Sequence, residues 1–284
     1  MAYESTGASQ WLVAPLALFL AVYYLAPLAV LFSYSLEPRG GGALTLANFV
    51  SFFRDPFLVE TLWVTIRLGI ETTLITLVIA VPFAYFASRS EPGVRRILIF
   101  VTLLPLLTST VVRSFAWVVI LGRRGLVNDA LTGLGLIDEP VRLLFTTSSV
   151  RIALVQVHLP LMVLPVLNAL DRINPTLEQA AQSLGASPAV AFWRIALPLA
   201  LPGIIAGSVL NFALTISAYV TPALVGGGSF NVLPILIYRR ATVSLNWTLA
   251  ATASVILLIT ALAVILLGQY AAHRISSGRY GANG

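Results

Sequence analysis

Six long apolar stretches run through this 284-residue chain and restrict what it can fold into. Their residues are 11–36, 62–88, 97–121, 149–170, 201–225 and 248–272. An α-helix crosses a bilayer core of about 30 Å with about 20 consecutive apolar residues, and each stretch reaches that length. The sequence therefore predicts an all-α, polytopic membrane protein with six transmembrane helices, organised as one domain over residues 1–284.

Composition agrees with this prediction. Hydrophobic residues make up 58% of the chain and charged residues only 10%, whereas ordinary soluble domains carry about 25% charged residues. The net charge of +6 comes from arginines, and most of these lie in connections beside the apolar stretches. We therefore expect the lipid bilayer, and no nucleic acid, as the partner of this charge.

Two absences narrow the chemistry. The chain has no cysteine, which excludes disulfides and thiolate metal sites. All 17 basic residues are arginines, so the phosphate-binding loop GxxxxGK[ST], which needs a lysine, cannot be present. Paired carboxylates and Ser/His/Asp sets in plausible proximity are also lacking. We expect no enzymatic activity, cofactor or metal in this chain, and any ATP with its Mg²⁺ would be bound by another chain.

A polar interruption at residues 171–202 has the pattern of two short amphipathic helices. Asn174 is a good N-cap for the first helix, and Gly185 stands where a left-handed C-terminal cap is wanted. Ser187 repeats the start signal for the second helix. Such a pair, with an apolar stripe on each helix, is expected at the membrane surface, where another protein can bind it.

The ends of this interruption, and the fifth apolar stretch after it, contain further helix breakers. Pro198 and Pro202 are expected to close the interruption. In the fifth stretch, Pro222 and the glycines at 226–228 are expected to break the helix, and broken helices at membrane depth usually line a cavity.

Polar residues inside the apolar stretches are expensive and are candidates for function. Arg67 and Glu71 lie four residues apart, so the two charges can neutralise each other on one helix face. His158 is expected to hydrogen-bond to a neighbouring helix, because no cysteine, aspartate or second histidine accompanies it as a metal ligand.

The polar interruption resembles the EAA loop of ATP-binding-cassette (ABC) importer permeases. The family pattern is E-A-A-x-x-x-G, nine residues and I-x-L-P, and this chain has QAAQSLG at 179–185, nine residues and IALP at 195–198. The first position differs, because Gln179 stands where glutamate is usual and Glu178 precedes it. The resemblance implies that the loop, about 171–200, docks in a cleft of a cytoplasmic ATPase.

The similarity extends over nearly the whole chain from Ala47 onward. The stretches VVRSFAWVVILGRRGLVNDALTGLGLIDEP, HLPLMVLPVLNALDRIN and SAYVTPALVGG resemble spermidine/putrescine-type permeases. This implies a type I ABC importer permease (MetI-like) fold in a bacterial inner membrane, with both termini cytoplasmic. It also implies three partners: a second permease subunit in a heterodimer, a cytoplasmic ATPase dimer and an extracytoplasmic solute-binding protein.

Two sets of candidate site residues follow. The ATPase-coupling set is Glu178, Gln179, Ala180, Ala181, Ser183, Gly185, Ala186, Phe192, Arg194, Ile195, Leu197 and Pro198. The substrate-pathway set, from the third to the fifth apolar stretch, is Arg113, Trp117, Asn211, Tyr219 and Thr221.

The solute and the energy source leave alternatives open. Trp117 and Tyr219 could attract ammonium groups by cation–π contact, which suits a polyamine, whereas Arg113 would repel a polycation. The alternatives are a permease of the same family for another amino compound, such as an opine or aminophosphonate, and a transporter or channel that works without ATP.

Overall fold

The computed structural model describes residues 8–38, 43–228 and 230–280, and of residues 8–14 and 271–280 it describes only the backbone. The described residues form helices joined by loops, with no strand among them. The longer helices are α1 (Ala8–Leu36), α3 (Pro56–Arg89), α4 (Pro92–Leu103), α5 (Thr110–Ile120), α7 (Thr147–Asp171), α10 (Leu197–Ile216), α12 (Leu233–Thr242) and α13 (Trp247–Tyr280). The short ones are α2 (Ala47–Arg54), η1 (Leu104–Leu107), α6 (Leu126–Gly133), α8 (Thr176–Ser183), α9 (Pro188–Ala191), η2 (Phe192–Ala196) and α11 (Val220–Val225).

The chain divides into two compact units. The first comprises residues 1–60 and 236–258, and the second comprises residues 61–235 and 259–284. The single domain over residues 1–284 stays a prediction. In the first unit, the Asn48 side chain donates hydrogen bonds to the carbonyls of Ser35 and Glu37, both at 2.9 Å. These bonds tie α2 to the end of α1.

Among the described residues, five helices are long and apolar enough to cross a membrane, and a bent pair raises the number to six if the pair is one span. This agrees with the predicted fold class. The third stretch is not one straight helix, however: 92–107 and 110–120 meet at a bend of 98°. The chain is extended at Thr108, and the Ser109 side chain then accepts a hydrogen bond from the Val111 N–H to start α5. A serine N-cap and the preceding Pro105 explain the break.

The fifth stretch breaks earlier than predicted. Helix α10 ends at Ile216, a short turn follows, and α11 begins at Val220. Pro222 lies buried inside α11, so the prediction that it breaks the helix is wrong. The first-turn N–H groups of a helix have no intrahelical acceptor, and a proline there therefore costs no hydrogen bond.

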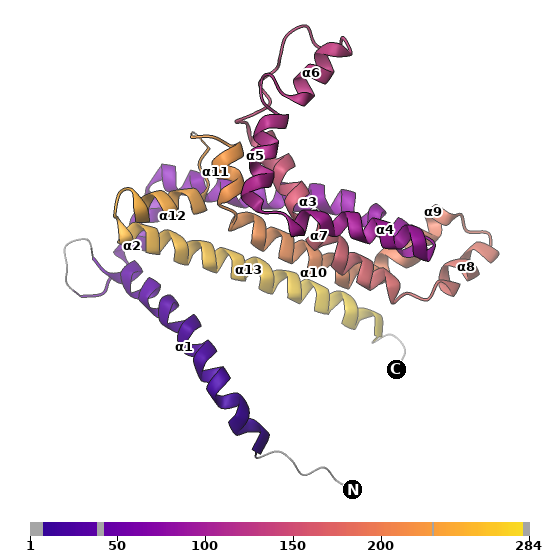
Figure 1. The fold of residues 1–284 in the computed structure, drawn as a ribbon. Coiled ribbons are helices and arrows are strands. Elements are labelled where there is room, and N and C mark those ends of the chain that lie inside the picture. Colours follow the sequence, from indigo (N-terminus) through magenta and orange to yellow (C-terminus); the bar gives the residue numbers. More distant parts are fainter. Residues whose placement is uncertain (1–7, 39–42, 229, 281–284) are drawn as a thin grey trace. The chain divides into compact units, whose positions relative to one another are not determined.

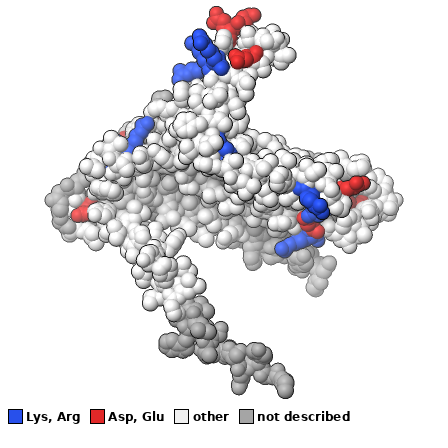
Figure 2. All heavy atoms as spheres, viewed as in Figure 1, with Lys and Arg blue, Asp and Glu red and all other residues white. Residues whose placement is uncertain are grey.

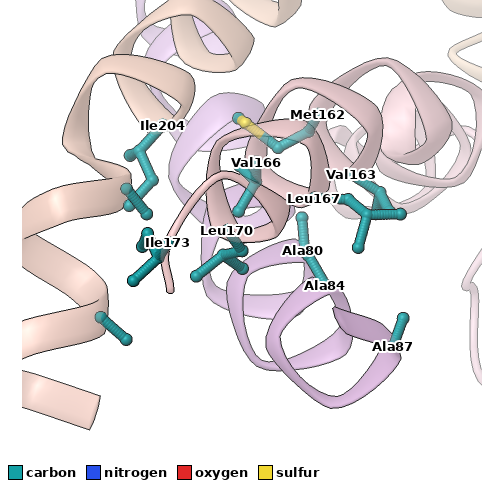
Figure 3. Close-up of a cluster of buried hydrophobic side chains, with 12 residues drawn as sticks. Ala80, Ala84, Ala87, Met162, Val163, Val166, Leu167, Leu170, Ile173 and Ile204 are labelled. Carbon is teal, nitrogen blue, oxygen red and sulfur yellow. The ribbon is translucent and has the colours of Figure 1, made fainter. Parts of the chain in front are cut away.

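The core that positions the loop lies between α3, α7 and α10 in the second unit. Ala80, Ala84 and Ala87 recur along one side of α3 and meet the larger side chains of α7, including Met162 and Leu170 (Figure 3). Small residues at such spacing allow two helices to pack closely, which is the usual source of helix association in lipid.

Helices α7 and α10 run side by side (Figure 1), and glycines set their separation. A Cβ added at Gly203 would lie 2.5 Å from the Pro165 carbonyl oxygen, and one at Gly207 would lie 2.9 Å from the Met162 sulfur. The two backbones therefore approach each other directly. The polar loop joins α7 to α10 in the sequence, so this tightly packed pair of helices fixes both ends of the loop.

Charged side chains are unevenly distributed over the surface. On the face drawn in Figure 2, groups of charged side chains lie around α6 and near α8 and α9, and single charged side chains lie elsewhere on a largely uncharged surface.

Candidate functional site

The first half of the loop begins as its capping residues predict. The Asn174 side chain accepts a hydrogen bond from the Thr176 N–H at 3.0 Å, although the helix itself begins one residue later than expected, at Thr176. Helix α8 ends at Ser183, and Gly185 follows the C-cap residue Leu184 with a φ of +93°. The Ala186 N–H donates to the Ala181 carbonyl at 3.0 Å, which is the bond of a glycine-capped helix end. The predicted glycine elbow is confirmed.

The second half begins as predicted but does not end as predicted. The Ser187 side chain accepts from the Val190 N–H at 3.3 Å, with Pro188 in the first turn of α9. Pro198 and Pro202 do not close a separate short helix, because 188–216 forms one candidate span. The π-helical segment η2 ends at Ala196, two residues before Pro198. Such local π adjustments re-satisfy backbone groups that a proline would leave unpaired.

The loop therefore consists of one separate short helix, α8, and the first turns of a span. Figure 1 shows α8 and α9 beyond the ends of α7 and α10. A rotation of α8 and α9 would act directly on α10, since no flexible link separates α9 from it. The sequence could not predict this continuity, because the prolines suggested helix ends.

Four large apolar side chains between residues 177 and 193 are exposed. Leu184 is 90% exposed and Trp193 64% exposed, and Leu177 and Val190 also face outward. We call these four residues the exposed apolar set. Isolated exposed leucines are common, whereas contiguous exposed apolar patches often belong to interaction sites.

The coupling residues predicted from the sequence fall into three groups by burial. Gln179, Ala180, Ser183, Gly185 and Arg194 are exposed. Ala181, Ala186, Phe192, Ile195, Leu197 and Pro198 are half-buried, and Glu178 is buried. Their roles stay predictions. Gln179 aligns with the glutamate of the family pattern and is exposed, whereas the preceding Glu178 is buried.

Glu178 is only 5% exposed and is held by α3. Its carboxylate forms an ion pair with Arg89 and accepts a hydrogen bond from the Tyr85 hydroxyl at 2.6 Å. The Arg89 guanidinium also lies over the Tyr85 ring, 5.6 Å from its centre. Sequence reasoning missed Tyr85 and Arg89. The only signal was their spacing of four residues at the polar end of the second apolar stretch.

Two further contacts support the loop from outside it. The Phe192 ring packs edge-on against Tyr85 with ring centres 4.7 Å apart. Arg95 of α4 pairs with Asp171, the last residue of α7. The base of the loop is thereby linked to α3 and α4, neither of which is adjacent to it in the chain.

The predicted pathway residues lie in two separate places. Trp117 and Tyr219 pack against one cluster of buried apolar residues, and the Thr221 hydroxyl lies 3.2 Å from that of Ser114, which joins α5 to α11. Asn211 lies elsewhere, at the contact between α3 and α10, where its Oδ1 accepts from the Thr73 hydroxyl at 3.4 Å. The structure thus brings three of the candidates to α5 and α11, whereas Asn211 contacts α3.

Arg113 has an unusual environment. Its Nη2 donates to Thr110 of the same helix at 3.2 Å. Its Nε and Nη1 are buried without a hydrogen-bond partner in the described part of the chain, and no described acidic residue forms an ion pair with it.

The other polar residues in the spans have structural partners. His158 Nδ1 lies 3.0 Å from the Thr215 hydroxyl of α10, which confirms a hydrogen bond to a neighbouring helix. Arg67 Nε and Arg151 Nη2 lie 2.8 and 2.9 Å from the two carboxylate oxygens of Glu71, so the predicted pair is confirmed and extended. Among the described residues, no group of three His, Asp or Glu side chains could hold a metal ion.

Comparison with known proteins gives one consistent result. Residues 72–277 match the family of binding-protein-dependent transport system inner membrane components. The spermidine/putrescine transport system permease protein PotB of Haemophilus influenzae is 30% identical over 262 residues, which cover 90% of this chain and 91% of that protein. PotB of Escherichia coli is 33% identical over 231 residues, covering 81% of this chain and 83% of that protein.

Solved structures agree on the fold. A bacterial ABC transporter involved in the import of the acidic polysaccharide alginate superposes with a TM-score of 0.80 at 20% identity, over 94% of this chain and 96% of that one. The MetNI methionine ABC transporter in an inward-facing conformation gives a TM-score of 0.60 at 18% identity, over 76% of this chain and 95% of that one. At these identities the similarity concerns the fold alone.

Proposed function

Because the chain belongs to the family of binding-protein-dependent transport system inner membrane components, we propose that it is a permease subunit that imports a polyamine, such as putrescine or spermidine, with energy from ATP. The polyamine assignment rests on the two PotB relatives, whose similarity covers most of both chains. As a transport subunit, the chain itself catalyses no reaction.

ATP is bound and hydrolysed by a separate cytoplasmic ATPase. The full sequence has no lysine and hence no phosphate-binding loop of the GxxxxGK[ST] type. The exposed apolar set supplies the contact instead, because an apolar helix face that fits a groove is a common mode of protein recognition. Leu184, at 90% exposure, carries this part of the proposal.

The remaining partners follow from the same assignment. A second permease, different from this one, completes the pathway, and an extracytoplasmic binding protein delivers the solute. If the bent pair counts as one span, the chain crosses the membrane six times, and both termini lie on the same side. That side is the cytoplasm, since the loop between α7 and α10 must reach the ATPase there.

Purification and uptake test the proposal together. The chain, expressed with its partner subunits, should co-purify with an ATPase. Proteoliposomes that contain the complex should transport labelled putrescine or spermidine only when ATP is present on the side of the membrane that carries the ATPase. A complex that transports without any ATPase would instead support an ATP-independent transporter. If the complex hydrolyses ATP but takes up neither polyamine, its solute is a different compound.

Arg113 favours a second candidate solute class. Its guanidinium has buried nitrogens without a partner in the described residues, and a fixed positive charge beside the pathway disfavours a polycation. A zwitterionic amino compound, such as an opine or an aminophosphonate, carries an acidic group that could pair with it. Competition of labelled polyamine uptake by such compounds distinguishes the two candidates.

A further inference from the structure

We propose that Glu178 is a positioning residue that fixes the ATPase-docking loop to α3, and that it does not contact the ATPase. This inference rests on the proposed function, because it concerns how the movement of the docked loop reaches the spans. The chain connects the loop only to α7 and α10. The contacts of Glu178 add α3 as a third span that must move with it.

Burial and charge support this assignment. Glu178 is 5% exposed, and both of its carboxylate oxygens are engaged, one by Arg89 and the other by the Tyr85 hydroxyl at 2.6 Å. A buried ion pair that loses one member leaves an uncompensated charge away from water, which is strongly unfavourable. Glu178 would therefore have to abandon a satisfied site on α3 in order to reach a partner protein.

Both halves of the loop meet the same side chain of α3. Helix α8 contacts Tyr85 through the Glu178 carboxylate, and the π-helical segment contacts it through the Phe192 ring, with ring centres 4.7 Å apart. Arg89 lies one turn further along α3 and stacks on the Tyr85 ring at 5.6 Å. A rigid-body rotation of the loop would thus be transmitted to the end of α3 by contacts that form one connected group.

Gln179 takes the exposed position next to Glu178, so Glu178 can pair with α3. Gln179 occupies the exposed position and faces away from the buried pair. In this chain the outward residue is neutral and the acidic residue faces inward. The exposed apolar set and Gln179 would contact the ATPase, while Glu178 fixes the loop to α3.

Charge exchange tests the inference in the whole reconstituted complex. Glu178→Arg and Arg89→Glu should each lower the solute moved per ATP hydrolysed by about tenfold, and the double variant E178R/R89E should return to within about threefold of the wild type. Glu178→Gln and Arg89→Gln, which keep the side-chain volume, should give smaller losses. Glu91→Gln and Arg96→Gln change exposed charges nearby and serve as matched controls with unchanged transport.

The measured ratio separates positioning from simple loss of structure. It is determined per assembled complex, together with the amount of co-purified ATPase and the thermal midpoint of the complex. If the charge-reversed single variants do not assemble, the glutamine variants carry the test, and a lowered ratio at normal assembly supports the inference.

Two results would overturn the inference. One is a wild-type ratio in both glutamine variants. The other is rescue of Glu178→Arg by an acidic substitution in the ATPase cleft but not by Arg89→Glu, since that would place the partner of Glu178 in the ATPase. Failure of the proposed function is distinct: in that case the wild-type complex itself would lack ATPase or polyamine uptake.

Discussion

The docking loop and the contact between α7 and α10 are built on opposite principles. In the loop, Leu184 is 90% exposed and Trp193 is 64% exposed. Between the two spans, glycines bring the backbones together until no space remains for a single added carbon at Gly203. If the proposed docking is correct, the exposed apolar side chains of the loop bind a partner, whereas the facing sides of α7 and α10 pack against each other. Substitutions in the two regions should therefore separate docking from stability.

The largest effect is expected from Leu184→Asp. A carboxylate placed in an apolar cleft loses its hydration without a partner, a cost of several kcal/mol, so transport should fall by about 100-fold or more. The thermal midpoint of the chain should stay unchanged, because the side chain is exposed. Uptake per mole of chain and ATPase co-purification measure the two effects, with Leu184→Met as the control. Full ATPase binding by Leu184→Asp would remove the loop surface from docking.

The reverse pattern is expected from Gly203→Ala. The added Cβ would lie 2.4 Å from the Ala169 Cβ and 2.5 Å from the Pro165 carbonyl oxygen, so the spans must separate at a cost of about 1–3 kcal/mol. The thermal midpoint of the solubilised chain should fall. Gly93→Ala, whose Cβ meets no atom within 4 Å, is the matched control and should be neutral or slightly stabilising. Equal midpoints for the two variants would contradict the close approach.

A smaller effect is expected at the elbow. Gly185 has φ +93° and open space around its Cα, so Gly185→Ala pays only the backbone penalty of about 1–2 kcal/mol. Gly185→Asn should lose less, because asparagine tolerates left-handed conformations. The loss should appear as weaker ATPase binding in a titration of the purified subunits. If alanine and asparagine bind equally well, the elbow geometry does not limit docking.

The smallest effect is expected from Asn211→Leu. The side chain is buried and accepts hydrogen bonds from Thr73 and Thr215, but hydrogen bonds between membrane helices average only about 0.6 kcal/mol. The thermal midpoint should fall slightly. Asn168→Leu, at an exposed position of α7, should change it less. A loss as large as that of Gly203→Ala would mean that Asn211 holds more than these two bonds.

Much of the local structure could be predicted from the sequence because its causes are local. The N-cap at Ser187 and the left-handed cap at Gly185 depend on neighbouring residues alone. The predictions that Pro198 and Pro222 end helices were wrong because they also used local rules alone. Pro198 and Pro222 break helices in general, but here one follows a π-helical segment and the other lies in a first turn. Those exceptions depend on where neighbouring helices allow the chain to turn.

For the candidate site, too, local features could be predicted from the sequence and contacts between distant helices could not. The sequence located the loop and its glycine elbow, and it grouped Glu178 with the ATPase-coupling residues without indicating its burial. Only packing revealed that this carboxylate is buried against Tyr85 and Arg89. Similarly, Asn211 and Trp117 were assigned to one pathway, whereas the structure places them in different contacts. Helical periodicity fixes which residues share a face, but it does not state which helix that face meets.

The sequence by itself determined that this chain is a helical membrane protein, that it carries no lysine-containing ATP site, and that a capped polar loop interrupts its apolar stretches. Each of these depends on composition, hydropathy or neighbouring residues. Tertiary structure alone decided that Glu178 pairs with a residue 89 positions earlier in the chain, and that α9 continues into α10. The physical reason is that the charge and stereochemistry of a residue are local properties, whereas its burial and its partners are set by how distant helices pack.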